Sequence, residues 1–462
     1  MLRATFFFII SLWLYYNAPD YYSYDLCLLY LSLFSINAFL TVQANLVNKN
    51  YLNFHLIFAV SFLFVNFIYP VFLYPIQVDY FAVFDRFPFN ENIITVSTAL
   101  ALLGYNSYSL GSNLVPFNRN NVSNSFNFRK PTVNYLKLYE KFIFILGLLF
   151  LLILIMSVWK DLILRKADAF FSVHPAILVM NQIFINLVIL INFYTIKFEK
   201  WSKPLMLIKK SPQIIYVLIY LSIFVITGDR GSAIQTVLVI LFAYSLNIKV
   251  IKPLAMASII AVGMVSLTFM SYFRSKDGGS LENVDNLEVR SSFDFAMDLI
   301  VTNRNLYAGY EYVAENGVNY GQGTIYYLFS PIPFLPTYIS NLIFDAPPAQ
   351  LTSAFILSDD ADASYGLGTN LVIDLYMQFG TFGVVFFLFA CGFLVSYFDF
   401  KSRNNFNLYM VSAFLFSFSI YMPRSTLFDV FRYLSWAFLM YYLFIFLFNS
   451  SNSDSEKNFN NK

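Results

Sequence analysis

Stretches of about 20 mostly apolar residues recur along this chain, the length that a helix needs to cross a lipid bilayer. Hydrophobic residues make up 58% of the 462 positions and charged residues only 12%, which is too little charge for a soluble globular protein. Phe and Tyr are unusually common, as in helices that face lipid and carry aromatic belts. We therefore expect an all-α polytopic membrane protein.

Twelve transmembrane helices fit this template. We place them near residues 4–17, 22–42, 53–76, 92–111, 138–158, 173–196, 211–227, 232–247, 250–272, 369–398, 406–421 and 430–449. The first is as short as the apolar core of a signal peptide. It lacks a small-x-small cleavage site, so we expect it to be retained as a short span.

Lys and Arg are distributed unevenly over the connecting segments, and cytoplasmic segments of membrane proteins hold the excess. With the N-terminus inside, the inner segments hold 18 of the 29 basic residues, the short outer segments 7 and the long segment 273–368 the other 4. Both termini are then cytoplasmic and the long loop is extracytoplasmic. The expected organisation is spans one to nine in 1–272, this outer loop in 273–368, spans ten to twelve in 369–449 and a disordered tail in 450–462.

The long outer loop is expected to contain short helices. Residues 293–304 place apolar side chains at helical spacing, which predicts an amphipathic helix on the membrane surface. Residues 320–324 predict a turn. Pro331-Ile332-Pro333 then predicts extended chain that cannot continue a helix.

Arginines from separate segments are predicted on this same outer side. Arg230 lies in a tight turn between two glycines, where it can make bidentate contacts with a phosphate, or else pair with Asp229 or reach lipid headgroups. Arg432 lies inside the start of span twelve, where a charge is costly unless it faces the protein interior. The other candidates for anion binding, each of which could instead anchor the interface or pair with a nearby carboxylate, are Arg274, Arg290, Arg304 and Arg424.

Span ten is the most polar of the predicted helices. Asn370, Asp374 and Gln378 recur every fourth residue and so share one face. A carboxylate inside a membrane helix is a functional candidate, although Asp374 could instead be the structural partner of an arginine. Gly380 and Gly383 on the same span are interpreted as allowing close helix packing.

Metal and cofactor chemistry finds little support in the sequence. Asp360-Ala361-Asp362 has a D-x-D form, but nearby carboxylates in a loop are usually solvated, so we expect no metal and no cofactor. With only His55 and His174, the chain offers no zinc set and no Ser/His/Asp triad. No Lys/Arg run indicates nucleic-acid binding. The loop tyrosines, Tyr320 among them, could stack on sugar faces or form an interfacial belt.

Three passages in the second half of the chain resemble a Wzy-type O-antigen or capsule polysaccharide polymerase. They are Thr227-Gly228-Asp229-Arg230-Gly231-Ser232, Tyr320-Gly321-Gln322-Gly323 leading to Pro331-Ile332-Pro333, and Gly368-Thr369-Asn370 through Tyr376-Met377-Gln378-Phe379-Gly380-Thr381-Phe382-Gly383. They occur in the family's order, whereas the first six spans match only in being hydrophobic. Members often have a basic residue after the loop prolines, where this chain has Phe334.

The resemblance implies a glycosyltransferase of the bacterial cytoplasmic membrane that moves a growing glycan from one undecaprenyl pyrophosphate onto another lipid-linked repeat unit. Its implied partners are these lipid-linked glycans, membrane lipids, a chain-length regulator and a flippase. Arg230, Arg274 and Arg432 are expected to hold the pyrophosphate, since outward cations stabilise a departing anion.

Arg290 and Arg304 are expected to position the pyrophosphate or the acceptor, with Tyr320 and Asn370 as further substrate contacts. Asp374, Asp429 or Asp229 could serve as the general base for the acceptor hydroxyl. Two other classes stay open: a lipid-linked oligosaccharide flippase or transporter, and an O-antigen ligase. A transporter is expected to show an internal repeat and central charges. Related ligases rely on a loop histidine that this loop lacks.

Overall fold

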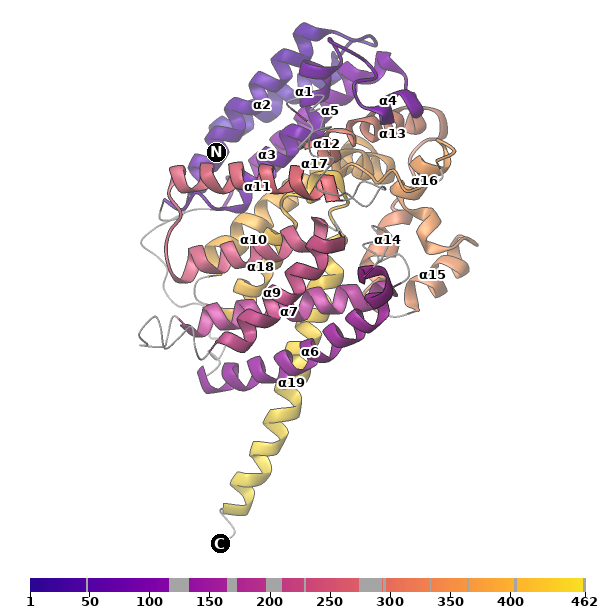
Figure 1. Cartoon of the computed structure of the whole chain (residues 1–462). Helices are drawn as coiled ribbons and strands as arrows, with labels where there is room; N and C mark the ends of the chain where they lie inside the picture. The colour runs from indigo at the N-terminus through magenta and orange to yellow at the C-terminus, as the bar shows by residue number, and fades with distance from the viewer. Residues whose placement is uncertain are drawn as a thin grey trace. The chain divides into compact units, whose positions relative to one another are not determined.

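The computed structural model describes residues 1–46, 49–115, 133–163, 173–196, 210–227, 230–273, 293, 296–332, 334–363, 365–402 and 405–459. Within these ranges every regular element is a helix (Figure 1). The chain divides into two compact units. Unit 1 consists of Met1–Phe126, Val250–Thr268 and Asn286–Asp429, and unit 2 of Asn127–Lys249, Phe269–Asp285 and Val430–Lys462.

Unit 1 is built around helix α5. Its helices are α1 (Leu2–Tyr16), α2 (Tyr24–Ala44), α3 (Phe54–Asn66), α4 (Ala82–Arg86), α5 (Ile94–Ser112), most of α11 (Pro253–Phe273), α12 (Met297–Ile300), α13 (Asn303–Asn316), α14 (Gln322–Phe329), α15 (Leu335–Ile343), α16 (Ser353–Asp359), α17 (Leu371–Lys401) and α18 (Phe406–Phe418). Short turns are η1 (Tyr69–Leu73), η2 (Glu91–Ile93), η5 (Pro348–Leu351) and η6 (Met422–Arg424). Helix α5 is almost wholly buried and packs against α17, α1 and α2.

Glycines let α5 and α17 approach closely. A Cβ built on Gly111 of α5 would lie 1.9 Å from the carbonyl oxygen of Phe389, and one built on Gly392 of α17 would lie 2.0 Å from that of Tyr108. Side chains larger than hydrogen would force these backbones apart, which is why small residues are common where membrane helices pack.

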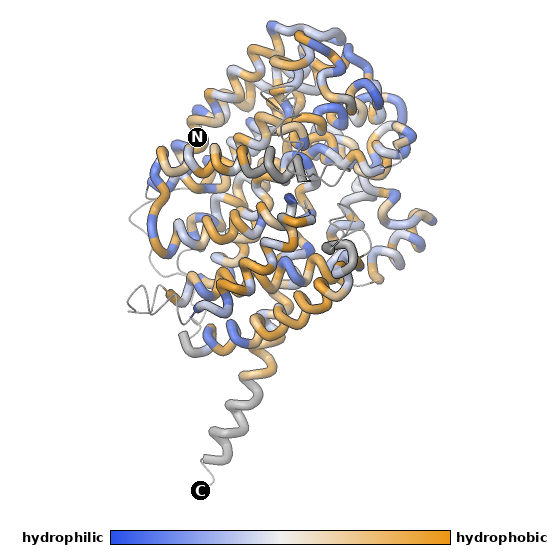
Figure 2. Tube along the Cα trace, viewed as in Figure 1, coloured by the Kyte–Doolittle hydropathy of each residue, from blue (hydrophilic) through white to orange (hydrophobic). Residues whose placement is uncertain are grey.

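Unit 2 consists of long helices. Those that the structure describes are α6 (Val133–Ile163), α7 (Pro175–Ile196), α9 (Ser211–Thr227), α10 (Arg230–Asn247) and α19 (Asp429–Phe459) without its first residue. Helix α7 packs against α6 and α10, and α6 is mostly apolar along its length (Figure 2). Before α9, the Lys210 ammonium donates to the Glu140 carboxylate of α6 at 2.7 Å.

Helices occupy all twelve places where the sequence predicts a span, and the all-helical membrane fold is confirmed. Six described helices are long and apolar enough to cross a bilayer: Tyr24–Ala44, Glu91–Ser112, Tyr135–Trp159, Pro175–Ile196, Leu371–Lys401 and Asp429–Phe448. Others, such as α1, α3 and α18, are apolar but shorter. Twelve crossings and an outward long loop therefore stay predictions.

Local boundaries differ from the expectations in three places. The helix expected at 293–304 is only α12, since the chain turns at Val301 and α13 starts at Asn303. The turn expected at 320–324 is confined to Tyr320 and Gly321, both at positive φ, and Gln322 already begins α14. The backbone of α19 stays helical to Phe459, beyond the point where a tail was expected.

Candidate functional site

Asn370 begins α17. Its Oδ1 accepts the backbone N–H of Val372 at 2.9 Å, which caps the helix, and its Nδ2 donates to Oδ1 of Asn66 on α3, also at 2.9 Å. Both side chains are fully buried. Asn370 thus joins α17 to α3, and its contact with substrate stays a prediction.

Asp374 lies one turn further along α17, with 3% of its surface exposed. The Ser353 hydroxyl of α16 donates to its Oδ1 at 2.6 Å and lies 2.8 Å from the Thr369 hydroxyl. The Thr426 hydroxyl is a second polar neighbour of this carboxylate. In the part of the chain that the structure describes, its partners are hydroxyl groups, so the alternative of pairing with an arginine finds no support there.

Helix α16 connects Asp374 to Arg304. Its first residue, Ser353, holds Asp374, while the Leu357 carbonyl accepts from Nη1 of Arg304 at 3.4 Å. The Nε of Arg304 donates to the Phe87 carbonyl at 3.2 Å. Burial lowers the pKa of Arg304, an effect opposed by the nearby carboxylates of Asp360 and Glu311. Arg304 is therefore buried and engaged with backbone, and anion binding by it stays a prediction.

Arg424 lies close in sequence to the Asp374 partner Thr426. It ends η6, is half-buried, and places its guanidinium carbon 5.7 Å from the centre of the Tyr421 ring. The turn η6, which Arg424 ends, packs against α17, the helix that carries Asp374. No sequence pattern could have singled out Ser353 or Thr426, since they lie 21 and 52 residues from Asp374 along the chain.

A break in α17 receives the loop that carries Tyr320. Gly380 has φ 65° and ψ −161°, which interrupts the helix. The Met377 carbonyl accepts the backbone N–H of Asn319 at 2.7 Å, and the Gln378 carbonyl accepts that of Gly321 at 3.0 Å. Gly380 thus serves a break and not the expected close packing, because a Cβ there would meet only Val318, at 3.7 Å. Tyr320 itself is 84% exposed.

Candidate residues in α10 and α19 lie at helix N-termini. Arg230 is the first residue of α10 and is half-buried. Arg432 lies in the first turn of α19, also half-buried, and its Nε is buried with no hydrogen-bond partner among the described residues. Asp429 begins α19, where a negative charge is favourable. Three further candidates, Asp229, Arg274 and Arg290, lie outside the described residues.

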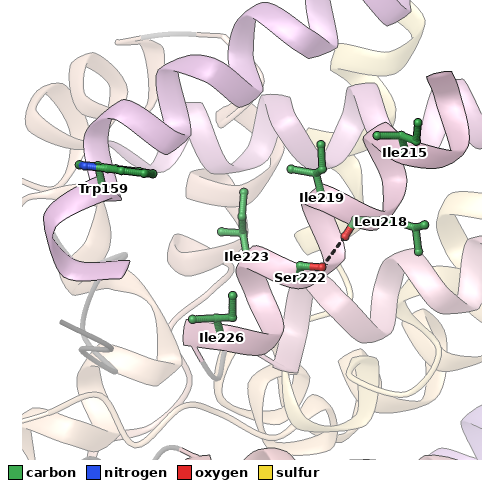
Figure 3. Close-up of a pocket in the computed structure, with 7 residues that line it drawn as sticks. All are labelled: Trp159, Ile215, Leu218, Ile219, Ser222, Ile223 and Ile226. Atoms are coloured by element: carbon green, nitrogen blue, oxygen red, sulfur yellow. Dashed lines mark hydrogen bonds between the residues drawn. The ribbon is translucent and has the colours of Figure 1, made fainter. Parts of the chain in front are cut away.

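A shallow groove of about 450 Å³ lies on unit 2 between Trp159 of α6 and one face of α9 (Figure 3). Apart from Ser222, whose hydroxyl donates to the Leu218 carbonyl within its own helix, the lining is apolar. None of the candidate site residues borders this groove. Its chemistry suits lipid chains and not a sugar. Among the described residues, no group of three His, Cys, Asp or Glu side chains could hold a metal ion.

Comparison with known proteins identifies one family. The family model for O-antigen polysaccharide polymerase Wzy matches residues 1–453, which is nearly the whole chain. Neither the curated proteins nor the solved structures provide a match. The match includes the first six spans, for which the sequence motifs offered no evidence.

Proposed function

Because the chain belongs to the O-antigen polysaccharide polymerase Wzy family, we propose that it joins undecaprenyl-pyrophosphate-linked repeat units on the outer face of the bacterial cytoplasmic membrane. The family acts on lipid-linked oligosaccharide repeat units in the membrane, so the chain is a multi-pass polymerase. The pyrophosphate carrier, the outward site and cytoplasmic termini are the parts that we propose. The uneven distribution of Lys and Arg supports the orientation.

The proposed reaction is a glycosyl transfer. The terminal hydroxyl oxygen of the acceptor glycan attacks the anomeric carbon of the donor, and the bond from that carbon to the pyrophosphate oxygen breaks. The pyrophosphate leaves with the bonding electrons, and a base takes the acceptor's proton. Guanidinium groups stabilise the charge that develops on the leaving group, a role that we assign to Arg230, Arg274 and Arg432.

We assign the role of general base to Asp374 because of the groups that surround its carboxylate. A carboxylate that served only to neutralise an arginine would lie against one, whereas the described partners of Asp374 are hydroxyl groups. It keeps lone pairs that can accept a proton. Because the side chain is buried, we propose that the proton arrives through the Thr426 or Ser353 hydroxyl, each of which can donate one proton while accepting another.

The test is Asp374→Asn, expressed in cells that lack the native gene. Asparagine keeps the size and can still accept the Ser353 hydrogen bond, but it cannot take up a proton. We expect the protein to reach the membrane at normal level and the long glycan ladder to disappear. The matched control is Asp359→Asn, an exposed carboxylate at the end of α16, which should leave the ladder unchanged. A normal ladder from Asp374→Asn would exclude Asp374 and leave Asp429 and Asp229 as candidates.

A gene knockout distinguishes the polymerase from its rivals. Loss of a polymerase leaves single capped repeats, loss of a ligase leaves polymer on the lipid carrier, and loss of a flippase leaves neither outside. We expect the knockout to leave single repeats on an otherwise intact surface glycan.

A further inference from the structure

A charge-free interval lies within the long segment between α11 and α17. From Asn316 to Phe344 the sequence contains no Asp, Glu, Lys or Arg, although Glu315 and Asp345 border it directly and are both exposed. In a water-exposed loop of this length, charged residues are normally frequent. The interval therefore differs in chemistry from the rest of the loop.

The described residues of the interval form two short helices, and the chain between them turns at Pro331 and Ile332. Helices α14 and α15 contain 8 and 9 residues and pack against each other (Figure 1). At about 1.5 Å per residue they are roughly 12–14 Å long, less than half of the hydrocarbon core of about 30 Å. They are too short to cross a bilayer but long enough to enter one side of it.

One face of α15 is apolar and uncovered. Phe334, Tyr338 and Leu342 follow each other at a spacing of four residues, with exposed fractions of 88%, 67% and 69%. Ile343 beside them is also exposed. The other side of the helix is anchored, because Ser340 is buried and its hydroxyl donates to the Ala346 carbonyl. The exposed face is therefore held in a fixed direction.

In the turn between the helices, some of the backbone N–H and carbonyl groups have hydrogen-bond partners within the turn itself. The Ile332 N–H donates to the Phe329 carbonyl at 3.0 Å, and the Leu335 N–H to the Ile332 carbonyl at 3.3 Å. The Ser330 hydroxyl donates to the Tyr327 carbonyl at 2.7 Å. Each internal bond lowers the cost of moving this backbone from water into the less polar membrane interface. Phe334 has φ 65°, which is unfavourable for a residue with a side chain, and it aims an apolar ring away from the protein.

We propose that α14 and α15 form a hairpin that enters the membrane interface, with the Phe334–Tyr338–Leu342 face against lipid. A protein partner would normally meet a polar, partly charged rim, which this interval lacks over its whole length. An aromatic and aliphatic face on a chain that already spans the membrane matches the composition of interfacial helices. The exposed Glu315 and Asp345 mark where the chain returns to water.

The experiment measures membrane depth with a nitroxide spin label. Full-length protein carrying Tyr338→Cys or Leu342→Cys is labelled in a background in which the two buried cysteines, Cys27 and Cys391, are replaced by Ala. It is placed in phosphatidylcholine nanodiscs, which contain no polyprenyl lipid. Power saturation then compares collisions with oxygen, which concentrates in lipid, and with a nickel chelate, which stays in water.

Labels at 338 and 342 should collide several-fold more with oxygen than with the nickel chelate. The controls Glu315→Cys and Asp359→Cys should show the reverse, since both positions are exposed and lie outside the interval. Nickel-dominated collisions at 338 and 342 would overturn the proposal in favour of a hairpin in water. Protection from both reagents would overturn it too, because protein, such as a second copy of this chain, would then cover the face.

Discussion

The side-chain oxygen of Gln378 accepts the backbone N–H of Gly323 at 2.9 Å, which fastens the start of α14 to α17. The backbone bonds from Asn319 and Gly321 to the Met377 and Gln378 carbonyls lie beside it. Two passages that resemble the family in sequence, 320–323 and 376–383, are therefore one structural unit. This unit holds the exposed side chain of Tyr320 in place next to the break in α17.

Replacing Gly380 by alanine should disturb this unit. At φ 65° and ψ −161° the backbone is in a region that is essentially restricted to glycine, so a Cβ costs about 1–3 kcal/mol. We expect either a lower melting temperature or a straightened helix that releases Asn319 and Gly321, with loss of long polymer in both cases. Thermal unfolding in nanodiscs and the glycan ladder measure the two effects. The control Gly263→Ala, where a Cβ meets nothing within 4 Å, should change neither.

Gly323→Ala tests the same contact from the loop side. The new Cβ would lie 2.6 Å from the Leu351 carbonyl oxygen and 2.7 Å from Nε2 of Gln378, so η5 or the glutamine must move. Overpacking of this kind costs about 1–3 kcal/mol. We expect shortened glycan chains together with a lower melting temperature. Gly366→Ala, which has open space around it, provides the comparison, and equal behaviour of the two variants would show that the contact is unimportant.

Arg304→Lys separates a structural from a substrate-binding role. Lysine keeps the charge but not the planar group that donates to both the Phe87 and Leu357 carbonyls. Leaving a buried carbonyl without its donor costs about 1–3 kcal/mol. We expect reduced membrane abundance and a lower melting temperature. A variant of normal stability that makes no polymer would instead show that Arg304 acts on substrate. Glu315→Gln, exposed on the same helix, is the control.

The helices could be predicted from the sequence because the length and hydrophobicity of an apolar run are local properties, and they suffice to indicate a membrane helix. Span ten is an example: its bounds and its polar face at Asn370, Asp374 and Gln378 agree with α17. The contacts of that face could not be predicted, because Ser353, Thr426 and Asn66 reach it only through tertiary packing. For the same reason, Arg304 could not be recognised as a buried residue. Its sequence neighbours are polar, and the backbone that surrounds it comes from Phe87 and Leu357.

Arg432 offers the sharpest test of anion binding. Its Nε is buried with no hydrogen-bond partner among the described residues, so a donor is available at the start of α19. A phosphate oxygen could accept from it, and the fork of a guanidinium can bind such an anion through two parallel bonds. Lysine keeps the charge but loses this geometry, and a charged hydrogen bond contributes about 1.5–3 kcal/mol. Arg432→Lys should therefore slow polymerisation on the order of ten- to a hundredfold, since each 1.36 kcal/mol is tenfold in rate.

The same change at exposed Arg86 should have no effect. The measurement is the rate of chain elongation in membranes supplied with purified lipid-linked repeats. A rate within twofold of the unmodified protein would remove Arg432 from the proposed pyrophosphate contacts.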